Sequence, residues 1–126
     1  MPKFLSLFSY SEGSLAAMID SPADREPQVR AVLESVGAEL EVFYWMFGAH
    51  DGLAIVDAPD SLTMAGVSAA ITSTGTVRGE TYELFSTADI RTILETAQRA
   101  RQSFTAWAPA RTRTAALRTV SSTETW

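Results

Sequence analysis

The sequence predicts an α+β domain in which a four-stranded antiparallel sheet carries two helices on one of its faces. Two apolar strand-like runs flank a short polar turn in the segment 43–60, FYWMFGAHDGLAIVDAPD. Two more strand-like runs lie at 3–10 and 76–85, and helical patterns separate the first strand from the second and the third from the fourth. The chain has 126 residues, 46% of them hydrophobic and 20% charged, which suits one globular domain.

The first strand is expected over Lys3–Tyr10, which is rich in Phe and Leu. A short helix of one or two turns follows at Ser14–Ile19. Asp24 is expected to cap a second helix, with Pro27 in its first turn, where no N–H is needed, and Gly37 at its end. The buried stripe of this helix is expected to consist of apolar residues at i, i+3, i+4 and i+7: Val29, Val32, Leu33 and Val36.

The second and third strands are expected at 38–47 and 51–58. The turn between them, Gly48-Ala49-His50, is short enough to make an antiparallel hairpin. The next helix is predicted through Ser73, capped by Asp60 or Ser61. Gly75 ends this helix before the fourth strand, at 76–85.

A last helix is expected to begin at Ser86 or Thr87, and its apolar stripe is Ile90, Ile93, Leu94 and Ala97. The first six elements follow the split βαβ order of ferredoxin-like folds, and right-handed crossovers place both crossover helices on one face of the sheet. We therefore expect a ferredoxin-like βαββαβ domain at 1–101, which includes this extra helix. Residues 102–126 are expected to form an extended basic tail, either disordered or docked on an acidic surface of its own or a neighbouring subunit.

Both faces of three strands are apolar. In the second strand, Phe43, Trp45 and Phe47 are expected to point one way and Leu40, Val42, Tyr44 and Met46 the other. In the first strand, Leu5 and Leu7 are expected to oppose Phe4, Phe8 and Tyr10. In the third strand, Leu53 and Ile55 are expected to oppose Ala54 and Val56. Helices cover one face, so we expect a second copy of the chain to cover the other, sheet against sheet. The alternative is that the C-terminal tail covers it.

The hairpin segment resembles the hallmark of the GYD domain family. The matching residues are Gly48, Asp51, Ala58, Pro59 and Asp60. His50 stands where the family commonly has Tyr, and Asp57 takes the acidic position before Ala-Pro. The Asp20-Ser21-Pro22 break, the Gly37 stop and the segment Gly75-Thr76-Val77-Arg78 match as well, so that the resemblance covers Phe4 to Leu94.

The resemblance implies a ferredoxin-like domain of the dimeric α/β-barrel type. The family has no assigned activity, so the resemblance transfers no catalytic residues to this chain.

Two acidic residues and the single histidine are candidate catalytic or binding groups. His50 beside Asp51 could form an acid/base pair, or Asp51 could simply hydrogen-bond the turn backbone. Asp57, at the end of an apolar strand, could be a buried base with a raised pKa. It could equally lie at the rim and cap the region of the following helix.

Tyr44 and Trp45 could stack on a planar ligand, or they could pack in the core and in a dimer interface. Glu39 and Glu41 share one strand face and could bind a cation, although charges on an edge strand more often block unwanted pairing. With one His and no Cys, the chain has no dense set of metal ligands. There is also no phosphate-binding loop, so we expect no metal and no cofactor.

The net charge of -5 argues against nucleic acid and anionic membranes as partners. The N-terminal segment has no long apolar run with a cleavage site, so a cytoplasmic location is expected.

The sequence thus favours a self-associating module that binds a small ligand or supports assembly. The alternative is a cofactor-independent enzyme of the monooxygenase or isomerase type found on dimeric α/β barrels. In that case His50 or Asp57 would be the base, while Tyr44 and Trp45 would hold a small, aromatic substrate. A third, purely structural hypothesis has the basic tail dock on an acidic neighbour and build a higher oligomer.

Overall fold

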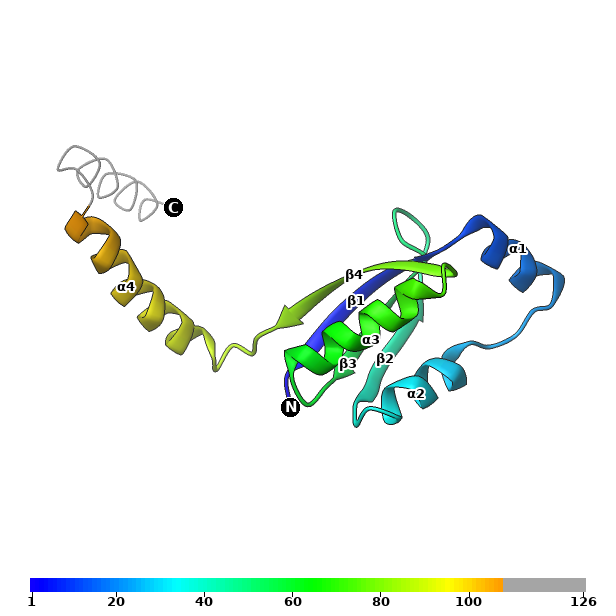
Figure 1. Cartoon of the computed structure of the whole chain (residues 1–126), viewed down its shortest axis with the longest axis horizontal. Coiled ribbons are helices and arrows are strands. Elements are labelled where there is room, and N and C mark those ends of the chain that lie inside the picture. The colour runs from blue at the N-terminus through cyan, green and yellow to red at the C-terminus, as the bar shows by residue number, and fades with distance from the viewer. Residues whose placement is uncertain (108–126) are drawn as a thin grey trace. The chain divides into compact units, whose positions relative to one another are not determined.

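The computed structural model describes residues 1–107 (Figure 1). The described residues divide into two units, residues 1–85 and a second unit that begins at residue 86. The tail predicted at 102–126 therefore lies, from residue 108 onward, outside the described residues.

The first unit contains one four-stranded sheet in the order β2-β3-β1-β4. Its strands are β1 (Lys3–Tyr10), β2 (Glu39–Trp45), β3 (Gly52–Asp57) and β4 (Val77–Leu84). Every neighbouring pair is antiparallel. This order and orientation define the ferredoxin-like fold, so the predicted fold class is confirmed. The strand boundaries differ from the predicted ones by no more than two residues.

Three helices belong to this unit: α1 (Glu12–Asp20), α2 (Glu26–Glu34) and α3 (Ser61–Ser73). Asp60 caps α3 as predicted, because its carboxylate accepts a hydrogen bond from the Thr63 N–H at 2.7 Å. This bond holds the pKa of Asp60 below its usual value. The glycines expected to end α2 and α3, Gly37 and Gly75, have φ angles of 77° and 71°, which favour glycine.

The start of α2 differs from the prediction by one residue. The N-cap position is occupied by Arg25, whose side chain makes no capping hydrogen bond. Asp24 lies one residue earlier and accepts a hydrogen bond from the Glu26 N–H at 3.0 Å. Pro27 has no N–H to satisfy, so Asp24 serves the helix start from outside it, and the side chain of Arg25 is left for other contacts.

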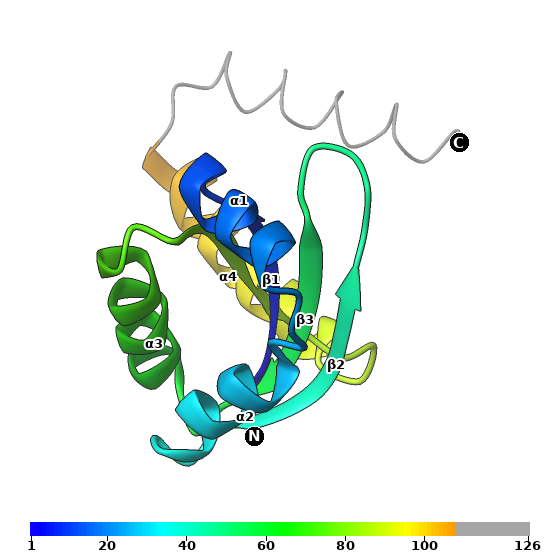
Figure 2. The same cartoon turned by 90° about the vertical axis from the view of Figure 1, so that its right-hand side faces the viewer.

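The two crossover helices lie over opposite edges of the sheet. Helix α2 packs against β2 and α3 against β4, as two separate helices on the same face (Figure 2). The core between helices and sheet contains Phe4, Phe8, Leu33, Ala38, Leu40, Ala54, Val56, Ala58, Met64 and Val67. The stripe predicted to be buried on α2 is buried only in part. Leu33 is buried, but Val32 and Val36 are 44% and 42% exposed, because α3 does not close over them.

A β-bulge changes the faces of β2. The pairing with β3 shifts between Leu40 and Val42, so that Leu40 pairs with Val56 and Val42 with Ile55. Leu40 is therefore buried on the helix face, whereas simple alternation placed it with Val42 and Tyr44 on the opposite face. The predicted alternation of β1 and β3 is confirmed, with Phe4, Phe8, Ala54 and Val56 on the helix face.

The second unit begins with α4 (Ile90–Trp107), which extends six residues past the predicted domain end at residue 101. Of the residues predicted to form its apolar stripe, Ile90, Ile93 and Leu94 are 48%, 38% and 60% exposed.

Gly52, at the start of β3, is required by the packing of Phe8. A Cβ at this position would lie 2.9 Å from the Tyr44 carbonyl oxygen and closer still to the Phe8 ring, which is buried. We expect Gly52→Ala to lower the free energy of unfolding by about 1–3 kcal/mol, since neither neighbour can move freely. Urea unfolding measures this change.

Gly66→Ala is the matched control. Gly66 lies inside α3 and a Cβ there meets nothing within 4 Å. Alanine should therefore stabilise the protein by about 0.5–1 kcal/mol. An equal effect of both substitutions would contradict the role of Gly52.

Candidate functional site

A cleft of about 350 Å³ opens between α2 and α3 and has the helix face of the sheet as its floor. Both helices and all four strands contribute to it. Its apolar lining is Phe8, Val29, Val32, Leu33, Phe43, Ala54, Val56, Met64, Val67, Ile71 and Val77. The cleft lies wholly within residues 1–85.

Small side chains on the middle of the sheet explain the cleft. Ser6 on β1 pairs with Ala54 on β3 and Thr81 on β4, and the three form a row across the floor. In the next row Phe8 pairs with Gly52 and Gly79, which have no side chains. Since the helices pack mainly over the edge strands, the large side chains of these two rows on the helix face are Phe8 and Phe43, and space remains beside their rings.

Aromatic rings form one wall of the cleft. Phe8 stacks on Phe43 with ring centroids 5.5 Å apart and meets Tyr10 edge-on at 5.8 Å. Tyr10 in turn stacks on Trp45 at 5.4 Å. Phe8, Tyr10 and Phe43 line the cleft, whereas Trp45 supports Tyr10 from outside it. The position of each ring in this wall is therefore fixed by its contact with a neighbouring ring.

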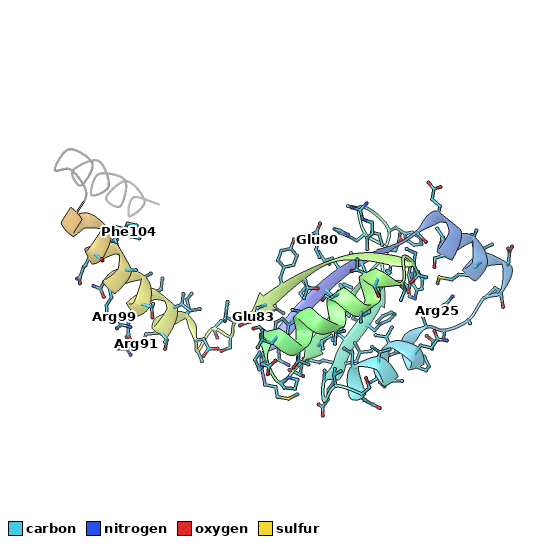
Figure 3. All side chains as sticks on the ribbon, viewed as in Figure 1. Arg25, Glu80, Glu83, Arg91, Arg99 and Phe104 are labelled. Carbon is cyan, nitrogen blue, oxygen red and sulfur yellow. The ribbon has the colours of Figure 1, made fainter. Side chains whose placement is uncertain are left out.

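The polar end of the cleft is formed by Arg25, Gln28 and Tyr10. Arg25 lies at the start of α2 (Figure 3), and its Nη1 donates to the Gln28 Oε1 at 3.4 Å. Burial raises the pKa of the Tyr10 phenol, an effect that the nearby positive charge of Arg25 opposes and the charge of Asp51 reinforces. Arg25 thus places a positive charge beside an otherwise apolar cavity.

His50 and Asp51 do not form an acid/base pair. The Asp51 carboxylate accepts a hydrogen bond from the Tyr10 N–H at 2.9 Å, and the Asp51 N–H donates to the Phe8 carbonyl at 2.8 Å. Asp51 therefore fastens the β2–β3 connection to the end of β1. This role is close to the structural alternative, except that the backbone it binds is that of a neighbouring strand.

His50 lies near a different carboxylate. Its Nε2 is 4.0 Å from the Glu80 Oε2, and the same carboxylate accepts a hydrogen bond from the Tyr82 hydroxyl at 2.6 Å. The latter bond raises the pKa of Tyr82. Glu80 and Tyr82 pair with Leu7 and Leu5, so this cluster lies on the sheet face away from the helices and the cleft.

Asp57 lies at the opposite end of the sheet from His50. Its carboxylate accepts a hydrogen bond from the Lys3 Nζ at 2.9 Å, and Lys3 also pairs with Glu41. Hydrogen bonds to Asp57 and then Glu41 raise the pKa of Lys3. Asp57 is thus a member of a rim ion pair, and the cap of α3 is Asp60 instead.

Tyr44 and Trp45 lie on opposite faces of β2. Tyr44 pairs with Leu53 and is 64% exposed on the open face, while Trp45 pairs with Gly52 on the helix face. They cannot hold one planar ligand between them. None of the predicted site residues lines the cleft: His50, Asp51, Asp57, Tyr44 and Trp45 all lie outside it. Glu41 pairs with Lys3, and no metal-binding cluster of His, Cys, Asp or Glu occurs among residues 1–107.

Sequence reasoning missed Arg25 and the small residues of the floor. A signal for the floor was present, because Ser6 interrupts the alternate Phe4 and Phe8 on a buried strand face. The sequence gives no comparable signal for Arg25, since an arginine before a helix is ordinarily a solvated surface residue.

The fold and the cleft define a ferredoxin-like α+β domain with a preformed apolar cavity between its helices and its sheet. A scan against family models matches the GYD domain over residues 4–94. The chain belongs to the GYD domain family, as the hairpin segment indicated. No curated protein and no solved structure matches it. Within residues 1–107, no helix has both the length and the apolar character needed to cross a membrane.

The placement of Asp51 predicts a difference between two adjacent substitutions. Asp51→Ala leaves the partly buried Tyr10 N–H without its acceptor, so the free energy of unfolding should fall by about 1–2 kcal/mol. Asp51→Asn keeps an acceptor oxygen and should lower the free energy of unfolding by less. His50→Ala removes only a 4.0 Å contact and should change stability little. Urea unfolding of the three variants tests this order, and a larger loss in His50→Ala would contradict it.

Proposed function

We propose that the protein is a self-associating module that binds a small ligand in the cleft between α2, α3 and the sheet. The observation that carries the proposal is the cleft itself. Its volume of about 350 Å³ is within the range of small-molecule sites, roughly 300–1,000 Å³. A mostly apolar lining with a few polar side chains is also typical of such sites.

The chemistry of the lining supports binding rather than catalysis. Among the described residues that line the cleft, the titratable side chains are Tyr10 and Arg25. Neither is a good general base near neutral pH, because the pKa of Tyr10 is raised and a guanidinium has N–H donors but no acceptor. His50 and Asp57, the bases of the enzyme hypothesis, lie outside the cleft. No observation therefore favours the enzyme hypothesis over binding.

Filling the floor of the cleft should weaken binding. We expect Ala54→Leu to weaken the binding of N-phenyl-1-naphthylamine, an uncharged dye that fluoresces in apolar surroundings, by at least about tenfold. The reason is that the larger side chain enters the cavity from the middle of the floor. Fluorescence titration measures the dissociation constant.

Ala69→Leu, the same change at an exposed position of α3 outside the cleft, is the control. Ala54 is buried, so Thr81→Leu, at an exposed floor position, gives an independent test if Ala54→Leu folds poorly. Unchanged dye binding in a folded floor variant would rule out the cleft as the site.

Self-association is supported by the face of the sheet that no helix of the first unit covers. Eight apolar or aromatic side chains of the strands share it: Leu5, Leu7, Val42, Tyr44, Leu53, Ile55, Tyr82 and Leu84. Charged groups lie at its two ends, with Lys3 and Asp57 at one and His50 and Glu80 at the other. An apolar centre with a polar rim is the composition expected of an interface. A second copy related by a two-fold axis would present the same surface.

A charge in the centre of this face should prevent association. Ile55→Lys leaves the core intact because Ile55 points away from the helices, and we expect it to halve the mass measured by light scattering. Leu62→Lys, at an apolar position of α3 that is 85% exposed, is the control and should leave the mass unchanged. A wild-type protein with the mass of a single chain would rule out self-association.

A further inference from the structure

We propose that the ligand of the cleft is a small apolar organic anion, whose carboxylate or sulfonate pairs with Arg25 while its ring or chain lies against Phe8 and Phe43. This inference rests on the proposed function, and it goes further by naming the ligand class and the residue that selects it.

The Arg25 side chain has a buried hydrogen-bond donor without an acceptor. Its Nε is buried and has no hydrogen-bond partner among residues 1–107. Its Nη1 reaches the Gln28 Oε1 only at 3.4 Å, and Arg25 takes part in none of the ion pairs of the described residues. A buried donor of a charged group without an acceptor is unfavourable, and an anion in the cleft would supply the acceptor.

The acidic residues around Arg25 are engaged elsewhere. Glu26, the next residue, pairs with Arg30 at 2.8 Å. Asp24 accepts the Glu26 N–H, and Asp51 accepts the Tyr10 N–H. No carboxylate of the described residues forms an ion pair with this guanidinium. A planar guanidinium offers two parallel N–H donors that match a carboxylate or a sulfonate.

The start of α2 is not itself the anion site. Its first N–H, that of Glu26, is already bonded to Asp24, and Pro27 has none. We therefore assign the attraction for an anion at this end of the cleft mainly to the charge of the Arg25 side chain, which a single substitution can remove.

The rest of the cleft selects an apolar body. The rings of Phe8 and Phe43 form a wall, and the small residues Ser6, Ala54 and Gly79 leave room beside them. Of the hydroxyl groups at the β4 side, those of Ser68 and Thr81 bond each other at 3.1 Å. A polar anion such as inorganic phosphate would leave most of this lining unused, whereas an aromatic or aliphatic acid would cover it.

A pair of dyes with the same ring system separates the charge from the apolar body. 1-Anilinonaphthalene-8-sulfonate carries a sulfonate that N-phenyl-1-naphthylamine lacks. We expect Arg25→Gln to weaken binding of the sulfonate by about tenfold, the effect of one charge-assisted hydrogen-bonded pair, and to change binding of the uncharged dye less than about twofold. Arg78→Gln removes an equal charge from β4 outside the cleft and should alter neither.

The outcomes are distinguishable. If Arg25→Gln weakens both dyes equally or neither, the ligand class is wrong although the cleft still binds. If neither dye binds the wild type, or if filling the floor leaves both affinities unchanged, the proposed function fails as well.

A competition experiment tests the same inference, and its main comparison uses only the wild type, so that it does not depend on the folding of a variant. 1-Naphthoate should displace the uncharged dye at about tenfold lower concentration than 1-naphthamide, because only the former has a negative charge for Arg25. The preference should shrink in Arg25→Lys, which keeps the charge but loses the paired donors. Equal potency of the acid and the amide in the wild type would overturn the inference.

Discussion

The position of the two crossover helices is the constraint on which the rest of the structure depends. Because α2 packs mainly on β2 and α3 mainly on β4, the helices lie chiefly over the edge strands rather than over the central strands β1 and β3. A core of ordinary density would need large side chains there, but Ser6, Ala54 and the glycines beside Phe8 are small. The space that remains is the cleft. Val32 and Val36 of α2 stay exposed for the same reason, since no neighbouring helix closes on them.

The alternation of β1 and β3 divides two roles between the faces of one sheet. Ser6 and Phe8 help to form the cleft, while Leu5 and Leu7 of the same strand lie on the face proposed for self-association. Both β1 and β3 are therefore largely apolar on their two faces, which is why their sequences show little alternation between apolar and polar residues. Substitutions at adjacent residues of β1 should affect different properties, so the two proposals can be tested independently.

The sequence predicted the order of the elements well, because each has strong local signals: Asp60 caps α3, Gly37 and Gly75 have positive φ, and a turn joins β2 to β3. It placed Leu40 on the wrong face, since a bulge depends on pairing with β3 and not on β2 alone. The site could not be predicted in the same way. His50 and Asp51 are adjacent in sequence but bond to different strands, and Arg25 reaches the cleft only through the packing of α2 on the sheet.

Arg25 occupies the N-cap of α2, where arginine is not a preferred residue. This departure from helix-capping preferences supports the assignment of Arg25 to ligand binding. An N-cap is most favourable as Ser, Thr, Asp or Asn, and here Arg25 occupies it without a capping bond while Asp24 serves the helix from one residue earlier. Arginine there adds nothing to the helix, since a cation at a helix N-terminus faces the positive end of the dipole. Local preferences are commonly overridden at functional sites. Here the residue that contradicts them is also the one whose buried Nε has no protein acceptor among the described residues, which is what a site for an anion requires.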